Sequence, residues 1–283
     1  INITKNNYVI NGNNHVIDCN NQARAFTITG SNVMVNNLII KNGFHDLGSA
    51  IKSTSSLTLK NVTFINCSGN GTENVGAVFS SEALLTVTNS NFIDNAGEEG
   101  ASISGYGSIV IVGNSTFISS SDKIIKGQIY LYQSDATIDK CNFLNTTSRY
   151  AAAIFAEKEL ELKITNSRFK NLHANKTAGA IAIKLIKSLN VENCEFDNAT
   201  SANNGGAIFA DANGNIVKNN PMTVWIDESR FTDCYSGFGG AILQLGGGLT
   251  VLNSNFTSNV AEYEGGALYT SYAIVQITNS KFD

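Results

Sequence analysis

The chain repeats itself about every 26 residues, and this period constrains its fold more than any other feature. A large apolar residue, usually phenylalanine, ends each unit. The series is Ile17, Ile40, Phe64, Phe92, Phe117, Phe143, Phe169, Phe196, Phe231, Phe256 and Phe282, and the steps from Ile40 are 24, 28, 25, 26, 26, 27, 35, 25 and 26 residues. A fixed period of this length indicates a stack of similar supersecondary units rather than one globular core.

Each unit contains short apolar runs that are separated by polar or glycine-rich turns. In residues 245–270, an alternating run at 249–252 is followed by a phenylalanine, a polar turn and a second apolar run that begins at Gly265. The Gly-Ala-aliphatic motif of that second run recurs at Gly76, Gly179, Gly206, Gly240 and Gly266. No segment shows the 3.6-residue period of a helix. We therefore predict an all-β fold, a single parallel β-helix of about eleven coils over residues 1–283.

Two columns of residues support stacking in register. The residue three places before each unit-ending residue is asparagine at eight of ten positions, namely Asn37, Asn61, Asn89, Asn114, Asn166, Asn193, Asn253 and Asn279, with Lys140 and Glu228 as the exceptions. Asparagine tolerates the left-handed backbone of a tight corner, and stacked amides form side-chain ladders. The next column holds small residues, namely Ser90, Ser115, Cys141, Ser167, Cys194, Ser229, Ser254 and Ser280. We expect the asparagines to form a ladder along one corner.

The composition excludes some partners. The chain has a net charge of −4 and 15% charged residues, without the basic stripe that binding to nucleic acid requires. No apolar run approaches the roughly 20 residues of a membrane-spanning helix, so we expect no membrane contact by this segment. The chain starts without methionine inside a strand-like run, and we expect it to be a segment of a longer surface protein. Its oligomeric state stays open.

The repeats resemble those of two families of surface proteins. The Phe-x-Asn and Gly-Gly-Ala-Ile motifs, such as Phe64-Ile65-Asn66, resemble repeats of chlamydial polymorphic outer-membrane proteins. The asparagine-rich opening at residues 9–18 looks more like the adhesin-like proteins of methanogenic archaea. The resemblance implies a right-handed parallel β-helix and a role at the cell surface.

Cysteines and histidines give no sign of a cofactor or a metal site. The five cysteines are Cys19, Cys67, Cys141, Cys194 and Cys234, and they are widely spaced without a Cys-x-x-Cys motif. We interpret all five as small residues that pack inward, because Cys141 and Cys194 share a column but are separated by a serine coil. The three histidines are interpreted as surface residues in turns.

Carboxylates are candidate catalytic residues because many parallel β-helices degrade polysaccharides. A glycosidase needs two carboxylates about 5–9.5 Å apart, and stacked coils supply such pairs readily. Asp227, Glu228, Glu262 and Glu264 are the candidates, and Trp225–Asp227 is similar to part of a pectate-lyase signature. The histidine expected next is Glu228 here, so solvated corner residues are the favoured interpretation. No aspartate cluster indicates calcium. We predict no catalytic residues and no enzyme.

An aromatic column is the candidate ligand-binding site. The residue after the Gly-Ala-aliphatic motif or its equivalent is aromatic in five coils, namely Phe79, Tyr130, Phe155, Phe209 and Tyr269. Lys52, Ile103, Ala182 and Leu243 fill this position in the remaining coils. Strand alternation points these side chains outward if the preceding aliphatic residues face the core. An exposed aromatic ladder can stack on sugar rings or contact a protein. The competing interpretation is that a loop covers the rings, which then pack only locally.

Three functions remain open. The first is an extracellular adhesin or surface stalk that binds glycans or proteins on a neighbouring cell through repeated contacts along a rigid face. The second is a polysaccharide lyase or glycoside hydrolase, with its groove near the insertion at residues 211–221. The third is a purely structural spacer.

Nine Asn-x-Ser/Thr sequons, among them Asn70 and Asn175, are candidate glycan attachment points in a secreted protein.

Overall fold

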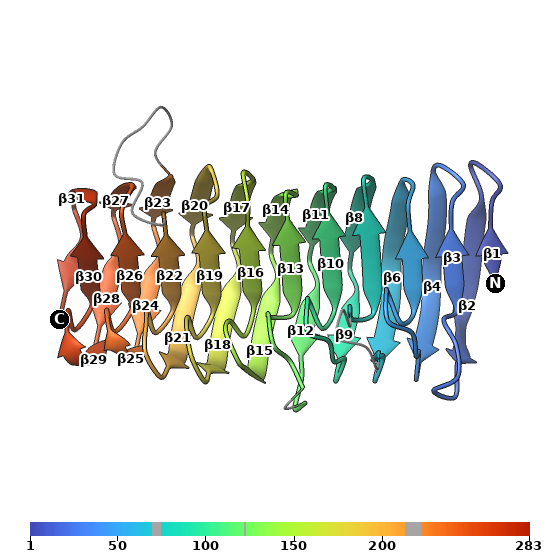
Figure 1. Ribbon diagram of the computed structural model, residues 1–283, viewed down its shortest axis with the longest axis horizontal. Helices are drawn as coiled ribbons and strands as arrows, with labels where there is room; N and C mark the ends of the chain where they lie inside the picture. Colours follow the sequence, from blue (N-terminus) through green and yellow to red (C-terminus); the bar gives the residue numbers. More distant parts are fainter. Residues whose placement is uncertain (70–74, 122, 213–221) are drawn as a thin grey trace.

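A computed structural model confirms the parallel β-helix. It describes residues 1–69, 75–121, 123–212 and 222–283, and these contain strands and turns but no helix. Asn70, Pro221 and most of the insertion around Pro221 lie outside the described residues. Figure 1 shows the coils side by side in chain order, with the N-terminus near one end and the C-terminus near the other. All strand pairs are parallel, and each joins a strand to its equivalent in the next coil.

One strand from each coil builds a first sheet of eleven strands, in agreement with the eleven coils predicted. Its strands, in spatial order, are β1 (Asn2–Ile3), β3 (Phe26–Ile28), β5 (Ile51–Ser53), β7 (Val78–Ser81), β10 (Ile103–Tyr106), β13 (Ile129–Tyr132), β16 (Ile154–Glu157), β19 (Ile181–Lys184), β22 (Ile208–Asp211), β26 (Ile242–Leu245) and β30 (Leu268–Ser271). Their spatial order follows the chain because each coil stacks on the one before it.

The remaining strands form a second sheet that bends around the rest of each coil. It contains β2 (Val9–Asp18), β4 (Val33–Lys41), β6 (Leu57–Ile65), β8 (Leu84–Thr88), β9 (Asn91–Ile93), β11 (Ile109–Gly113), β12 (Thr116–Ile118), β14 (Asp135–Asp139), β15 (Asn142–Ser148), β17 (Glu161–Thr165), β18 (Arg168–Ala174), β20 (Ser188–Glu192), β21 (Glu195–Ser201), β23 (Thr223–Asp227), β24 (Arg230–Thr232), β25 (Tyr235–Phe238), β27 (Gly248–Leu252), β28 (Asn255–Thr257), β29 (Val260–Glu264), β31 (Ile274–Thr278) and β32 (Lys281–Phe282). The two sheets enclose one continuous apolar core.

The phenylalanines that mark the period form a stack through this core. Neighbouring rings from Phe64 to Phe282 have centroids 4.6–5.0 Å apart and are within 14° of parallel. Ile17 pairs with Ile40, and Ile40 with Phe64, so the isoleucines occupy the same column. The period in the sequence is therefore the spacing of one buried side chain per coil.

The predicted asparagine ladder is present. All ten residues of the column have a left-handed backbone, with φ between 46° and 54°, including Lys140 and Glu228. Asn61 donates an amide hydrogen bond to Asn37 over 2.8 Å, and Asn193 donates one to Asn166 over 2.8 Å. At the two exceptions the preceding aspartate accepts the bond instead. These aspartates are Asp139, which Asn166 reaches at 2.7 Å, and Asp227, which Asn253 reaches at 2.9 Å.

A second left-handed corner lies two residues after the phenylalanine in most coils. Asn66, Asn145, Asn171 and Asn198 have φ values between 47° and 54°. Their amides also bond from coil to coil, as between Asn171 and Asn145 at 2.9 Å. The Phe-x-Asn motif thus combines a core residue with the corner that follows it. The motif is visible in the sequence, whereas the corner that explains it is visible only in the folded coil.

The small-residue column satisfies buried backbone groups. The hydroxyls of Ser115 and Ser167 accept hydrogen bonds of 3.1 Å from the backbone N–H groups of Ser90 and Cys141 in the preceding coils. Unpaired N–H groups at these buried positions would cost free energy. Four of the five cysteines are buried, as predicted, and Cys19 is partly buried against the core. None of them forms a disulfide.

Burial makes the four inner cysteine thiols unreactive. It raises the pKa of Cys67, Cys141 and Cys234 to about 12 and that of Cys194 to about 11. Because the thiolate is the reactive form, we expect at most one thiol, Cys19, to react with a disulfide reagent at pH 8 in the folded protein, and five in denaturant. A Cys19→Ser variant is the control and should show no rapid reaction. Rapid modification of two or more thiols in the folded protein would contradict this burial.

Candidate functional site

The predicted aromatic column faces away from the core but is not exposed. The aliphatic residues before the rings, such as Val78 and Ile129, are fully buried in the central core, as predicted. However, Phe79, Tyr130, Phe155 and Phe209 are only 8%, 2%, 3% and 4% exposed, and Tyr269 is partly exposed. The prediction of an exposed ladder was therefore wrong for four of the five residues. A role of these five residues in ligand binding stays a prediction.

The rings are covered because segments of the chain fold over the outer face of the first sheet. Tyr130, Phe155 and Phe209 form a second apolar cluster, separate from the core, with Ala151 and Ala178 from the segments that precede β16 and β19. Tyr150 packs edge-on against Phe155, with ring centroids 6.3 Å apart. The competing interpretation from the sequence, local packing under covering segments, describes these rings.

One of the coils that lack a ring in this column, the coil of Ser104, borders a pocket. Ser104, rather than Ile103, pairs with Phe79 and Tyr130, so the sequence prediction was shifted by one residue in this coil. Ile103 instead faces the core. The small Ser104 leaves room for the Tyr106 ring, which lies 5.5 Å from the Phe79 ring and 5.6 Å from the Tyr130 ring.

The pocket at this position, here called the aromatic pocket, has a volume of about 520 Å³. It is lined by Leu47, Val75, Phe79, Glu99, Tyr106, Lys126, Tyr130, Tyr132 and Glu157. These residues come from β7, β10, β13 and β16 and from the segments that lead into β5, β7, β10 and β13. Of the five aromatic residues predicted to bind ligand, Phe79 and Tyr130 are thus part of it.

A network of charged and phenolic groups crosses the aromatic pocket. The Lys126 ammonium lies 2.8 Å from Glu99 Oε1 and 3.5 Å from Glu157 Oε1, and each of the three side chains is 20–25% exposed. The Tyr130 hydroxyl donates a hydrogen bond of 2.5 Å to Glu157, and the Tyr106 hydroxyl donates one to Glu99. Lys126 Nζ also lies 4.6 Å from the centre of the Tyr130 ring, close enough for a cation–π interaction.

This network keeps the Lys126 ammonium and the Tyr130 hydroxyl protonated. Burial alone lowers the pKa of Lys126, but the hydrogen bonds and charges of Glu99 and Glu157 outweigh it, and the net shift is upward. Burial, followed by the hydrogen bond and charge of Glu157, raises the pKa of Tyr130. Both residues therefore act as hydrogen-bond donors at neutral pH.

The pocket residues could be recognised only in part from the sequence. Glu99 lies in a bend and Lys126 in an isolated β-bridge, both outside the named strands and without a distinctive motif, and they meet because their coils are adjacent. Glu157 occupies the last position of its strand, which pairs with Tyr132 in the coil before it. The repeat period is the one feature of the sequence that indicates which of these residues are neighbours, since residues one period apart share a column.

The carboxylates considered for catalysis lie elsewhere. Asp227 accepts a ladder hydrogen bond, and Glu228 occupies the left-handed corner with φ of 47°. Glu228 borders a shallow groove of about 370 Å³ that is also lined by Arg168 and Arg230. Glu262 and Glu264 lie in exposed positions of β29. Asp227 and Glu228 therefore are corner residues, as the sequence analysis favoured.

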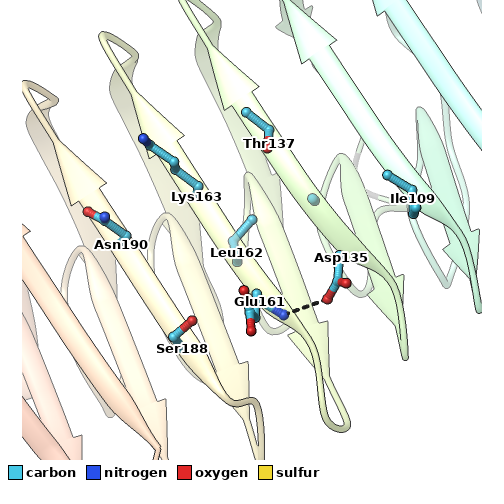
Figure 2. A pocket seen from close by; sticks show the side chains of 9 residues that line it. Ile109, Asp135, Thr137, Glu161, Leu162, Lys163, Ser188 and Asn190 are labelled. Atoms are coloured by element: carbon cyan, nitrogen blue, oxygen red, sulfur yellow. Dashed lines mark hydrogen bonds between the residues drawn. The ribbon is translucent and has the colours of Figure 1, made fainter.

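Another groove, of about 330 Å³, runs over the outer face of β11, β14, β17 and β20. Figure 2 shows Thr137, Lys163 and Asn190 on successive strands, with Asp135 accepting a hydrogen bond of 2.8 Å from the backbone N–H of Glu161. Its lining contains no aromatic residue. The aromatic pocket is therefore the stronger candidate site, because it combines rings with converging polar groups.

Within the described residues, no three histidine, cysteine, aspartate or glutamate side chains lie close enough together to hold a metal ion. No helix long and apolar enough to cross a membrane was found among them.

Comparison with known proteins agrees with the architecture. The family model described as "Right handed beta helix region" matches residues 123–282, which is more than half of the chain. The chain therefore belongs to the right-handed β-helix family. No curated protein matches the sequence.

Proposed function

We propose that this β-helix is an extracellular cell-surface domain that binds glycans, with the aromatic pocket as its binding site. The observation that supports the proposal best is the convergence of aromatic rings and hydrogen-bonding groups on the outer face of a regular stack of strands. Sugars present apolar faces that pack on aromatic rings, and hydroxyls that hydrogen-bond to carboxylates and phenols. The pocket volume of about 520 Å³ suits a small ligand or one or two sugar rings of a longer chain.

The adhesive part of the proposal is supported by the repeats. They resemble those of methanogen adhesin-like proteins and of chlamydial polymorphic outer-membrane proteins, and the asparagine corners give the surface a polar character. The partner we propose is a glycan on a neighbouring cell, or a glycosylated protein there. Several such domains on one surface would gain avidity from individually weak contacts.

Tyr132 provides the most direct test, because it lines the pocket, is partly exposed and is not part of the charged network. A glycan array with the purified chain first identifies a ligand. We then expect Tyr132→Ala to weaken binding of that ligand about tenfold, which corresponds to the loss of one sugar–aromatic contact. Titration calorimetry measures the affinity, and the melting temperature monitors the fold.

The matched control is Tyr235→Ala. This tyrosine is 43% exposed on β25 and does not line the aromatic pocket. Its removal should leave the affinity unchanged. Equal loss of binding in both variants, or no binding on the array and in a cell-adhesion assay, would contradict the proposal. The second of these results would favour a structural spacer.

The paired carboxylates favour one alternative, a polysaccharide-degrading enzyme. Glu99 and Glu157 both contact Lys126, so the two carboxylates are close neighbours, and glycosidases act through a pair of neighbouring carboxylates. Against a lyase, Lys126 and Tyr130 have raised pKa values, whereas a lyase base must be deprotonated at the working pH. Release of reducing or unsaturated sugar ends from a polysaccharide panel, lost in Glu99→Gln, would replace the binding proposal with catalysis.

A further inference from the structure

From the charges and hydrogen bonds of the aromatic pocket, we infer that its ligand is a neutral or amino sugar rather than an acidic one. This inference rests on the proposed glycan-binding function and specifies the class of glycan. The described lining residues include one cation, Lys126, and two carboxylates, Glu99 and Glu157, which gives a formal charge of −1. A uronate or sulfate group entering the pocket would therefore meet a charge of its own sign.

Lys126 has no free hydrogen-bond donor with which to bind the anionic group of an acidic ligand. An ammonium group has three N–H donors, and three acceptors lie around this one. They are Glu99 Oε1 at 2.8 Å, Glu157 Oε1 at 3.5 Å and the Tyr130 hydroxyl at 3.5 Å. An incoming carboxylate would have to replace a contact that Lys126 already makes. The cation thus organises the two glutamates and leaves no donor free for a ligand anion.

The glutamates, in contrast, retain capacity to accept hydrogen bonds. A carboxylate has about four acceptor positions. Glu99 accepts from Lys126 and from Tyr106, and Glu157 Oε1 accepts from Lys126 and Tyr130. Among the described residues, no donor contacts Glu157 Oε2. A ligand that complements this arrangement brings donors, which are the hydroxyls of a neutral sugar or the ammonium group of an amino sugar.

Three β-1,4-linked tetrasaccharides with the same ring geometry test the inference: a glucose oligomer, a glucosamine oligomer and a glucuronate oligomer. At low salt we expect the glucuronate oligomer to bind about tenfold more weakly than the glucose oligomer, the effect of roughly one screened like-charge contact. The glucosamine oligomer should bind at least as tightly as the glucose oligomer. Added salt should reduce the differences in affinity between the three oligomers, because it screens the electrostatic interactions between the ligand and the charged pocket residues.

The double variant Glu99→Gln/Glu157→Gln changes the formal charge of the lining from −1 to +1 and should reverse the preference toward the glucuronate oligomer. Glu195→Gln is the control, since this residue forms an exposed ion pair with Arg168 outside the pocket. It should leave the ratio of affinities unchanged. If the double variant does not fold, the inference is still tested by the ratio of the wild-type affinities for the glucose and glucuronate oligomers and by the salt dependence of that ratio.

The outcomes separate the inference from the function on which it rests. Tighter binding of neutral and amino oligomers, reversed in the double variant, supports the inference. Equal or tighter binding of the acidic oligomer by the wild type overturns it and leaves glycan binding intact. Absence of binding to these oligomers and to every glycan of the array overturns the proposed function, and the inference with it.

Discussion

Replacing Phe169 with alanine is expected to lower the free energy of unfolding by about 3–5 kcal/mol. Phe169 is fully buried, and its ring lies between those of Phe143 and Phe196, with centroids 5.0 and 4.6 Å away. Alanine removes the ring and leaves a cavity that the fixed spacing of the coils prevents from collapsing. Urea denaturation measures the loss. Hydrogen exchange should locate it in the adjacent coils, because a solenoid repeat contacts mainly its neighbours.

Phe282→Ala is the matched control for the stack. Phe282 is 42% exposed and contacts only one ring of the column, that of Phe256. Its removal therefore loses less buried area and creates no enclosed cavity. If Phe169→Ala and Phe282→Ala had the same small effect, the stacked rings would not be a major source of stability.

Gly206→Ala is expected to destabilise the fold by about 3 kcal/mol or more, at the upper end of overpacking substitutions. A Cβ at Gly206 would lie 1.9 Å from the carbonyl oxygen of Gly240 and 2.8 Å from the backbone nitrogen of Tyr235. Backbone atoms of the next coil cannot move aside without breaking strand pairing. Gly76, Gly179 and Gly240 approach the next coil in the same way. Circular dichroism and thermal melting of the purified variant measure the effect.

Gly248→Ala is the control for this prediction. Gly248 lies in β27, and the nearest atom to an added Cβ is a side-chain methyl of Thr223 at 4.0 Å. Alanine fits there and also reduces the freedom of the unfolded chain, so stability should be unchanged or slightly higher. A Gly206→Ala protein as stable as the Gly248→Ala protein would show that the coils can separate locally. The Gly-Ala-aliphatic motif would then need another explanation.

The position of a residue within the period predicted its column, but the surroundings of that column were harder to predict. Asn89 and Asn114 meet in the ladder because a fixed repeat places equivalent residues one above the other. Phe79 and Tyr130 were placed correctly on the outer face. Their burial depends on residues outside the strands, such as Ala151 near Tyr130 and Leu47 near Phe79, and the local pattern of apolar residues does not encode that arrangement.

The sequence by itself determined the parallel β-helix, its asparagine corner and its column of phenylalanines. Each of these depends on a side chain repeated once per coil, so that the spacing along the chain becomes the spacing in the stack. Only the tertiary structure decided where a pocket opens. That pocket depends on Ser104 interrupting a column of rings and on Glu99, Lys126 and Glu157 coming together from three coils. Such single departures from the repeat carry no periodic signal, and their effect depends on which side chains pack around them in space.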